Sequence, residues 1–202
     1  LAHRTSPSFD FYLFSLISGS ILSLSILVDE PALFILGAIL APFMAPYLGI
    51  SFAAIMGSMS FFLRSLAGFL IGSFLVFLTG LVAGYATEFS STTTYKYAHL
   101  HAQLSWPNLI LLAVGVIVTT GAVVRFSRTA NVASVALSYA LYIPISIAGF
   151  GLTSNIPDLW PDGLVVYSAY LAWGALLGVL TMILLGFRPL SLFGYTLGGV
   201  LL

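Results

Sequence analysis

The chain of 202 residues is 60% hydrophobic, and only 6% of it is Asp, Glu, Lys or Arg. Soluble domains carry about 25% charged residues, so this composition excludes a soluble globular protein and predicts one whose surface is covered by a lipid bilayer. The formal net charge of zero gives no reason to expect nucleic acid as a partner, and the absence of cysteine excludes disulfides, thiol catalysis and thiolate metal sites.

Apolar residues form six blocks along the chain, which we interpret as membrane spans at residues 11–28, 31–59, 61–86, 109–124, 132–153 and 164–187. A membrane helix needs about 20 residues, so the second block is too long for one straight span. Residues 87–108 form the loop between the third and fourth spans, and residues 1–202 make one transmembrane domain. Because the sequence starts at Leu1 and stops in an apolar run, we expect further sequence, including soluble regions, to flank it.

The basic residues predict the orientation of the spans. If all six blocks cross and the N-terminus is cytoplasmic, the cytoplasmic side carries Arg4, Arg64, Arg125, Arg128 and Arg188. The other side carries Lys96 and the acidic residues Asp29, Glu30, Glu88, Asp158 and Asp162. Lys and Arg collect on the cytoplasmic side of membrane proteins. We therefore expect a multi-pass protein of the plasma (inner) membrane, with both termini cytoplasmic and residues 87–108 outside.

Small residues recur at four-residue spacing in the second block, and glycine pairs follow in the third and sixth blocks. Helices in lipid associate through close backbone contact at such residues, because hydrocarbon exerts little hydrophobic force between them. The second, third and sixth spans are therefore the predicted packed interior. The residues expected to pack one helix against another are Ala41, Ala45, Gly49, Gly68, Gly72, Gly80, Gly84, Gly174 and Gly178.

Prolines interrupt two of the predicted spans. Pro42 and Pro46 lie within "GAILAPFMAP" in the second block, and Pro144 lies in the fifth. Each proline lacks an N–H and displaces a carbonyl four residues earlier, which in hydrocarbon needs another partner. We therefore predict an all-α fold of six transmembrane helices, with the second and fifth broken at these prolines. An interrupted middle span in each half predicts a 3+3 inverted repeat with a binding site at its centre.

The stretch "DEPALFILGAILAPFMAPYLGISFA", followed by "LRSLAGFLIGSFL", resembles the hallmark of the domain of unknown function 389 family of hydrophobic membrane proteins. Pro31, Gly37, Ala38, Pro42, Met44 and Pro46 match that hallmark. "NVASVALSYALYIPISIAGFGL" and "LLGFRP" resemble later family segments, although Ile143 replaces one of two adjacent prolines. The resemblance implies a six-span membrane domain, often joined to soluble sequence, and it implies no known activity.

The predicted binding site lies between the broken segments of the second and fifth spans. Carbonyls freed by prolines and hydroxyls of Ser and Tyr would contact the solute there. The candidate substrate-binding residues are Gly37, Pro42, Pro46, Ser138, Tyr139, Tyr142, Pro144 and Ser146. We expect no cofactor.

The polar residues outside the spans could form a functional site or serve an ordinary structural role. His99 and His101 form a His-x-His pair, but a metal site needs further ligands and Glu88 is the nearby carboxylate, so we favour ordinary loop histidines and expect no metal. Asp29 and Glu30 precede Pro31, where acidic residues favour a helix start. The alternative for these two acids is a cation-attracting mouth.

Enzyme motifs are absent from the sequence, and no histidine lies at membrane depth to activate a serine, so we expect no enzyme. The sequence favours a transporter or channel for a small solute or ion, and six short spans favour a homo-oligomer. The alternative is a non-transporting structural or assembly subunit of a larger membrane complex. In that case the small-residue stripes would bind partner helices.

Overall fold

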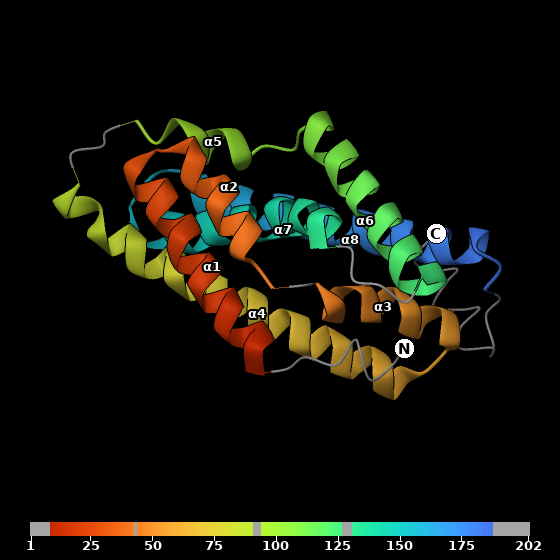
Figure 1. Cartoon of the computed structure of the whole chain (residues 1–202). Coiled ribbons are helices and arrows are strands. Elements are labelled where there is room, and N and C mark those ends of the chain that lie inside the picture. Colours follow the sequence, from red (N-terminus) through yellow and green to blue (C-terminus); the bar gives the residue numbers. More distant parts are fainter. Residues whose placement is uncertain (1–8, 43, 91–93, 127–130, 188–202) are drawn as a thin grey trace.

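The computed structural model describes residues 9–42, 44–90, 94–126 and 131–187, and within these ranges it is helical without strands (Figure 1). The helices are α1 (Phe9–Val28), α2 (Pro31–Leu40), α3 (Ala45–Met56), α4 (Met59–Tyr85), the 3-10 turn η2 (Ala86–Phe89), α5 (Lys96–His101), α6 (Trp106–Phe126), α7 (Asn131–Thr153) and α8 (Leu159–Leu184). Among the described residues, α1, α4, α6, α7 and α8 are long and apolar enough to cross a membrane, and the pair α2–α3 makes a sixth candidate if it counts as one span.

The ends of the bent pair are defined by local signals in the sequence. The Glu30 carboxylate caps α2 by accepting from the Ala32 N–H at 3.3 Å, and proline occupies the first turn, where no N–H is needed. α3 ends at Gly57, whose φ of 65° is the left-handed conformation that glycine adopts without strain. Ser58 then caps α4 by accepting from the Phe61 N–H at 3.4 Å. The turn between α3 and α4 is therefore short and fixed.

Side-chain contacts show that α1 and α4 run in the same direction. Phe11, near the start of α1, lies against Gly72 of α4, and Ser23, further along α1, bonds to Thr79 of α4 at 3.1 Å. The chain must therefore return from one end of the bundle to the other between these two helices. The pair α2–α3 makes that return, with a bend of 60° between its two helices.

The centre of the bundle is α7, which packs against α1, α2, α4, α6 and α8. Its closest neighbour is α4, and the two helices cross backbone to backbone. A Cβ atom on Gly80 would strike the Ser146 carbonyl oxygen, and one on Gly149 would strike the Phe77 carbonyl oxygen. Residues 141–150 of α7 are all buried. Glycine on both sides of the crossing thus allows two backbones to approach as closely as helices can.

The predicted break of the fifth span at Pro144 is wrong. α7 is one helix from Asn131 to Thr153, with Pro144 inside it. The reason is tertiary: the helix is enclosed by its neighbours, and α8 approaches it so closely at Gly163 that a Cβ there would lie 2.8 Å from the Pro144 carbonyl oxygen. Packing on every side holds the helix through a proline that would interrupt an isolated one.

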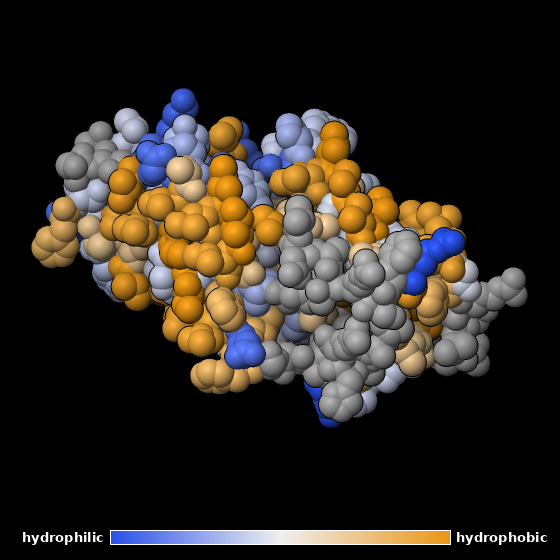
Figure 2. All heavy atoms as spheres, in the orientation of Figure 1, coloured by the Kyte–Doolittle hydropathy of each residue, from blue (hydrophilic) through white to orange (hydrophobic). Residues whose placement is uncertain are grey.

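The described surface matches a hydrocarbon environment. Large apolar side chains are exposed along the helices, with Phe74 57% and Val82 68% exposed on α4 and Ile110 61% exposed on α6. Figure 2 shows hydrophobic side chains covering much of the face formed by α1 and α2. The described charged residues lie near helix ends or in the connections, and none is buried. Such a surface is stable in lipid and not in water.

The α4–α7 crossing gives a first prediction. Gly149→Ala places a methyl group on the Phe77 backbone, so we expect a loss of about 1–3 kcal/mol of stability and a lower melting temperature in detergent. The matched control is Gly121→Ala in α6, where a Cβ would meet no described atom within 4 Å. Alanine favours a helix over glycine by about 1 kcal/mol, so this variant should be at least as stable as the wild type. Equal melting temperatures for Gly149→Ala and the wild type would contradict the crossing.

Candidate functional site

The bend between α2 and α3 lies against α7, and the neighbouring helices supply hydrogen bonds to its backbone. Ser134 of α7 accepts from the Met44 N–H at 3.1 Å, and Ser18 of α1 donates to the Gly37 carbonyl oxygen at 2.7 Å. Met44 is 0% exposed, and Pro42 and Pro46 are buried. Backbone polar groups at the bend are thus served by side chains of other helices, as the absence of water in a bilayer requires.

The N-terminus of α3 lies inside the protein. Met44 is its N-cap and provides no side-chain hydrogen bond to the first turn. The residues from Pro46 to Ile55 are all buried, so the first turn of this helix is enclosed. A helix N-terminus carries a partial positive charge from its aligned peptide dipoles. The bend therefore places an oriented dipole end within the bundle.

Two of the predicted hydroxyls on α7 bind α1. Ser15 donates to its own helix at the Phe11 carbonyl oxygen, so the Tyr142 hydroxyl is the donor in the 2.8 Å bond between Tyr142 and Ser15. By the same logic Ser146 donates to Ser23 at 3.0 Å, and Ser23 donates to Thr79 of α4. Ser146, Ser23 and Thr79 therefore form a directed chain of hydroxyls across α7, α1 and α4, in which each bond polarises the next. Tyr142 and Ser15 form a separate pair.

The other predicted residues of α7 lie apart from that chain. Ser138 donates to the Ser134 carbonyl oxygen of its own helix at 3.0 Å. Tyr139 bonds to His101 of α5 at 2.8 Å. Pro144 lies within the continuous helix. The structure therefore brings Gly37, Pro42 and Pro46 together at the bend, whereas the predicted hydroxyls divide between α1, α5 and α7 itself.

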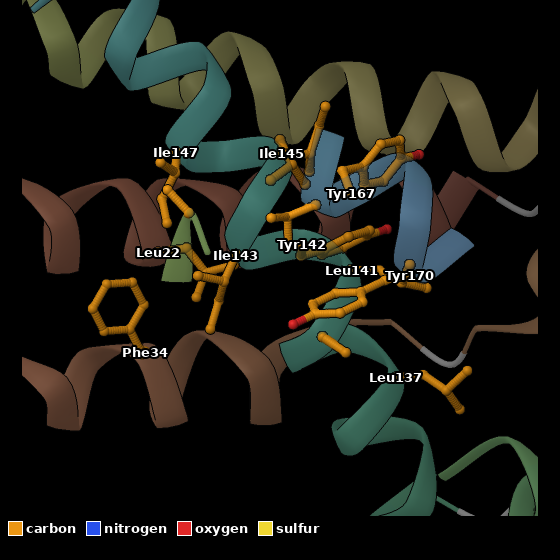
Figure 3. Close-up of a cluster of buried hydrophobic side chains, with 14 of the residues drawn as sticks. Leu22, Phe34, Leu137, Leu141, Tyr142, Ile143, Ile145, Ile147, Tyr167 and Tyr170 are labelled. Atoms are coloured by element: carbon orange, nitrogen blue, oxygen red, sulfur yellow. The ribbon is translucent and has the colours of Figure 1, made fainter. Parts of the chain in front are cut away.

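Tyrosines of α3 and α8, which were not among the predicted site residues, lie beside the bend. Tyr47, directly after Pro46, donates to the Leu171 carbonyl oxygen at 3.3 Å, and Tyr167 donates to Ser73 of α4 at 2.9 Å. Phe69 lies between them, with ring centroids 5.3 Å from Tyr47 and 6.5 Å from Tyr167. Figure 3 shows the rings of Tyr142, Tyr167 and Tyr170 near one another in the core, with the Tyr170 hydroxyl directed to the opposite side from the other two. A tyrosine in an apolar span needs a partner for its hydroxyl, and that signal was present in the sequence.

Five of the predicted packing glycines lie at helix contacts. Gly174 and Gly178 of α8 leave room for the hydroxyls of Tyr47 and Ser51, and Ser51 donates to the Ala175 carbonyl oxygen at 3.2 Å. Gly72 faces Phe11 of α1. Gly80 and Gly84 approach α7. Of the other members of the set, Gly49 and Gly68 are buried, and Ala41 and Ala45 are half-buried.

The loop histidines face different environments. His99 is exposed, whereas His101 is 8% exposed and stacks on Phe34 with ring centroids 5.2 Å apart. Among the described residues no three His, Asp or Glu side chains are grouped as metal ligands. Asp29 and Glu30 both cap helices: Asp29 accepts from the Lys96 and Tyr97 N–H groups at 3.0 and 2.9 Å, and Glu30 caps α2.

These features define a multi-pass membrane protein with a bent helix pair that packs against its central helix α7. A family model described as "Domain of unknown function (DUF389)" matches residues 38–186, which run from the last turn of α2 to just past the end of α8. The chain belongs to the DUF389 family, as the proline-rich hallmark of the second span predicted. Comparison with curated proteins gave no match, and comparison with solved structures gave none.

The hydrogen bond at the bend gives a second prediction. Ser134→Ala leaves the buried Met44 N–H without its acceptor, so we expect a loss of about 1–3 kcal/mol of stability, measured by thermal unfolding in detergent. Ser168→Ala is the control, because Ser168 is exposed and donates only to its own helix at the Leu164 carbonyl oxygen. It should change stability by less than about 0.5 kcal/mol. Similar effects of the two variants would show that Ser134 does not support the bend.

Proposed function

We propose that this protein is a transporter or channel for a small solute or ion, which binds at the bend between α2 and α3. The observation that carries the proposal is the buried start of α3 beside the end of α2, inside the bundle. Interrupted helices in membrane proteins present the N–H groups of one half and the carbonyl groups of the other to solutes near the middle of the bilayer. Ser134 and Tyr47 add hydroxyls at the same place.

The directions of the helices support six spans. α1 and α4 run parallel. If α2–α3 counts as a single crossing between them, successive spans cross the membrane in alternating directions along the whole described chain. α8 runs antiparallel to α7, since Gly163 lies against Pro144 while Gly151 lies against Trp160. The orientation with cytoplasmic termini in a plasma (inner) membrane remains our proposal. It rests on Arg64 and Arg125 at one end of the bundle and the acidic connections at the other.

The packing of the two halves supports the 3+3 inverted repeat. In each half the first span packs against the third, as α1–α4 and as α6–α8. Across the halves, α4 packs on α7 and α8 packs on α3, which are equivalent contacts under such a repeat. A repeat of this kind places its symmetry axis near the bend, where alternating-access transporters bind their substrates.

A substrate would replace hydrogen bonds that already join the helices at the bend, because the hydroxyls described there have partners. The Tyr47 and Tyr167 hydroxyls and Ser134 bind other helices of the bundle. A polar solute at the bend would take over such bonds, and the helices joined by them would separate. We further propose that the protein works as a homo-oligomer and not as an enzyme. The rival function, a non-transporting subunit of a larger complex, is an outcome of the test below.

Flux through the purified protein in proteoliposomes tests the proposal, with a panel of labelled monovalent ions and small neutral and anionic metabolites as solutes. Once a solute is found, the double variant Pro42→Ala/Pro46→Ala should reduce its flux by at least about tenfold, because it allows α2 and α3 to form a continuous helix. Pro107→Ala, at an exposed proline in the first turn of α6, should retain it.

Two outcomes would overturn the proposal. A flux that survives in the double variant would remove the bend from the mechanism. No flux for any solute in the panel, together with stable copurification of other membrane subunits, would establish the structural or assembly role instead.

A further inference from the structure

The short helix α5 covers one end of the bundle, between the end of α4 and the start of α6 (Figure 1). It packs against α7 and α8, and its inner face is fully enclosed, with Ala98 0% and Tyr95 7% exposed. The Tyr95 ring meets Phe150 of α7 edge-on at 5.3 Å. On its outer face Leu100 is 55% exposed. We refer to Tyr95–Ala102 as the cap.

One polar side chain holds each end of the cap through two hydrogen bonds. At its start, the Asp29 carboxylate accepts from the Lys96 and Tyr97 N–H groups at 3.0 and 2.9 Å. At its end, His101 bonds through Nδ1 to the Tyr97 carbonyl oxygen and through Nε2 to the Tyr139 hydroxyl of α7, both at 2.8 Å. The bond between His101 and Tyr139 ties the cap to the central helix α7.

The partners of His101 determine where its proton lies. A carbonyl oxygen only accepts, so Nδ1 carries the hydrogen, and Nε2 of the neutral ring accepts from Tyr139. A second proton would bind at Nε2, in the position that the Tyr139 hydroxyl hydrogen occupies. The ring is also stacked on Phe34, and burial lowers the pKa of His101 from its ordinary value of 6.5, partly offset by the hydrogen bond to Tyr97. Its present environment therefore favours the neutral ring.

We propose that the cap is a pH-sensitive gate, closed while His101 is neutral and released from α2 and α7 when His101 is protonated. Protonation turns Nε2 into a donor, so the Tyr139 hydroxyl has to turn and accept, and its own hydrogen loses its partner. It also places a charge among apolar side chains. The cation regains its hydration when the cap leaves. Release would uncover Phe34 and Tyr139, on the helices that lead to the bend. Opening of the cap does not depend on whether the protein transports a solute.

Among the groups around the cap, His101 is the residue whose protonation we expect to open it. α2 contributes Phe34 and α7 contributes Tyr139. α8 also packs on α5, and its Tyr170 hydroxyl accepts from the Ser105 N–H at 3.3 Å, beyond the end of the cap. Within the described residues no ion pair to His101 is formed. Of the charged and titratable groups of the cap region, Asp29 lies at the opposite end of α5, and Lys96 and His99 are exposed. None of these three contacts the His101 ring.

The sign of the pH effect follows from the lowered pKa. The closed cap disfavours the proton relative to the open one, so the stability of the closed state is fully present above the ordinary pKa of 6.5. It is lost as the pH falls below that value towards the lowered pKa of the closed state. Acidification therefore opens the cap.

Thiol labelling in the purified protein tests this, because the chain contains no cysteine. Ala98→Cys places a thiol under the cap, and Leu100→Cys places one on its exposed face as a reference. A water-soluble maleimide is applied at about pH 7.5 and about pH 5, on either side of the ordinary histidine pKa. The ratio of the two labelling rates removes the effect of pH on thiol chemistry. We expect this ratio to rise by about tenfold or more at the lower pH.

Two variants assign the effect to the proposed residue. His101→Gln cannot titrate and should give the same labelling ratio at both pH values. His99→Gln, two positions away on the exposed face, should keep the full pH response. A ratio that does not change with pH in the otherwise unaltered protein would overturn the proposal, whatever the folding of the variants. A response that survives in His101→Gln would equally overturn it.

Discussion

The backbone contact between α4 and α7 is the constraint on which the rest of the structure depends. Gly80 on one helix and Gly149 on the other each face a carbonyl oxygen of the partner, so neither position has room for a side chain. Lipid gives helices no hydrophobic reason to associate, and close packing has to replace it. With α4 and α7 in contact, α1 lies along both of them, and α8 closes the other side of α7.

Buried hydroxyls then fix how the surrounding helices are placed. Tyr142 and Ser146 join α7 to α1, Ser23 joins α1 to α4, and Tyr167 joins α8 to α4. Each bond satisfies two polar groups that would otherwise be unpaired in hydrocarbon, where an unpaired group costs several kcal/mol. These contacts join specific pairs of atoms, so they add a positional requirement to the close packing of the apolar side chains. The hydroxyls therefore select one arrangement among many that the glycines would allow.

Much of this architecture could be predicted from the sequence, because length and apolar composition determine membrane spans directly. The glycines were predicted as packing residues from their four-residue spacing within the spans. Pro144 was misinterpreted because a proline's effect on a helix depends on what surrounds the helix, and the enclosure of α7 by its neighbours is a tertiary fact. The predicted hydroxyl site mixed residues with different partners, since Ser146 and Tyr139 share a face in sequence spacing yet bond to α1 and α5.

We propose that α2 and α3 together form one bent crossing, which places the start of α3 inside the membrane domain. Single cysteines at Ala32, in the first turn of α2, and at Met59, in the first turn of α4, report the two ends of that crossing. Both positions are exposed, so a membrane-impermeant thiol reagent can reach them. The account predicts that Ala32→Cys and Met59→Cys are labelled from opposite sides of the membrane. Labelling of both from the same side would show that the pair turns back without crossing, and would contradict it.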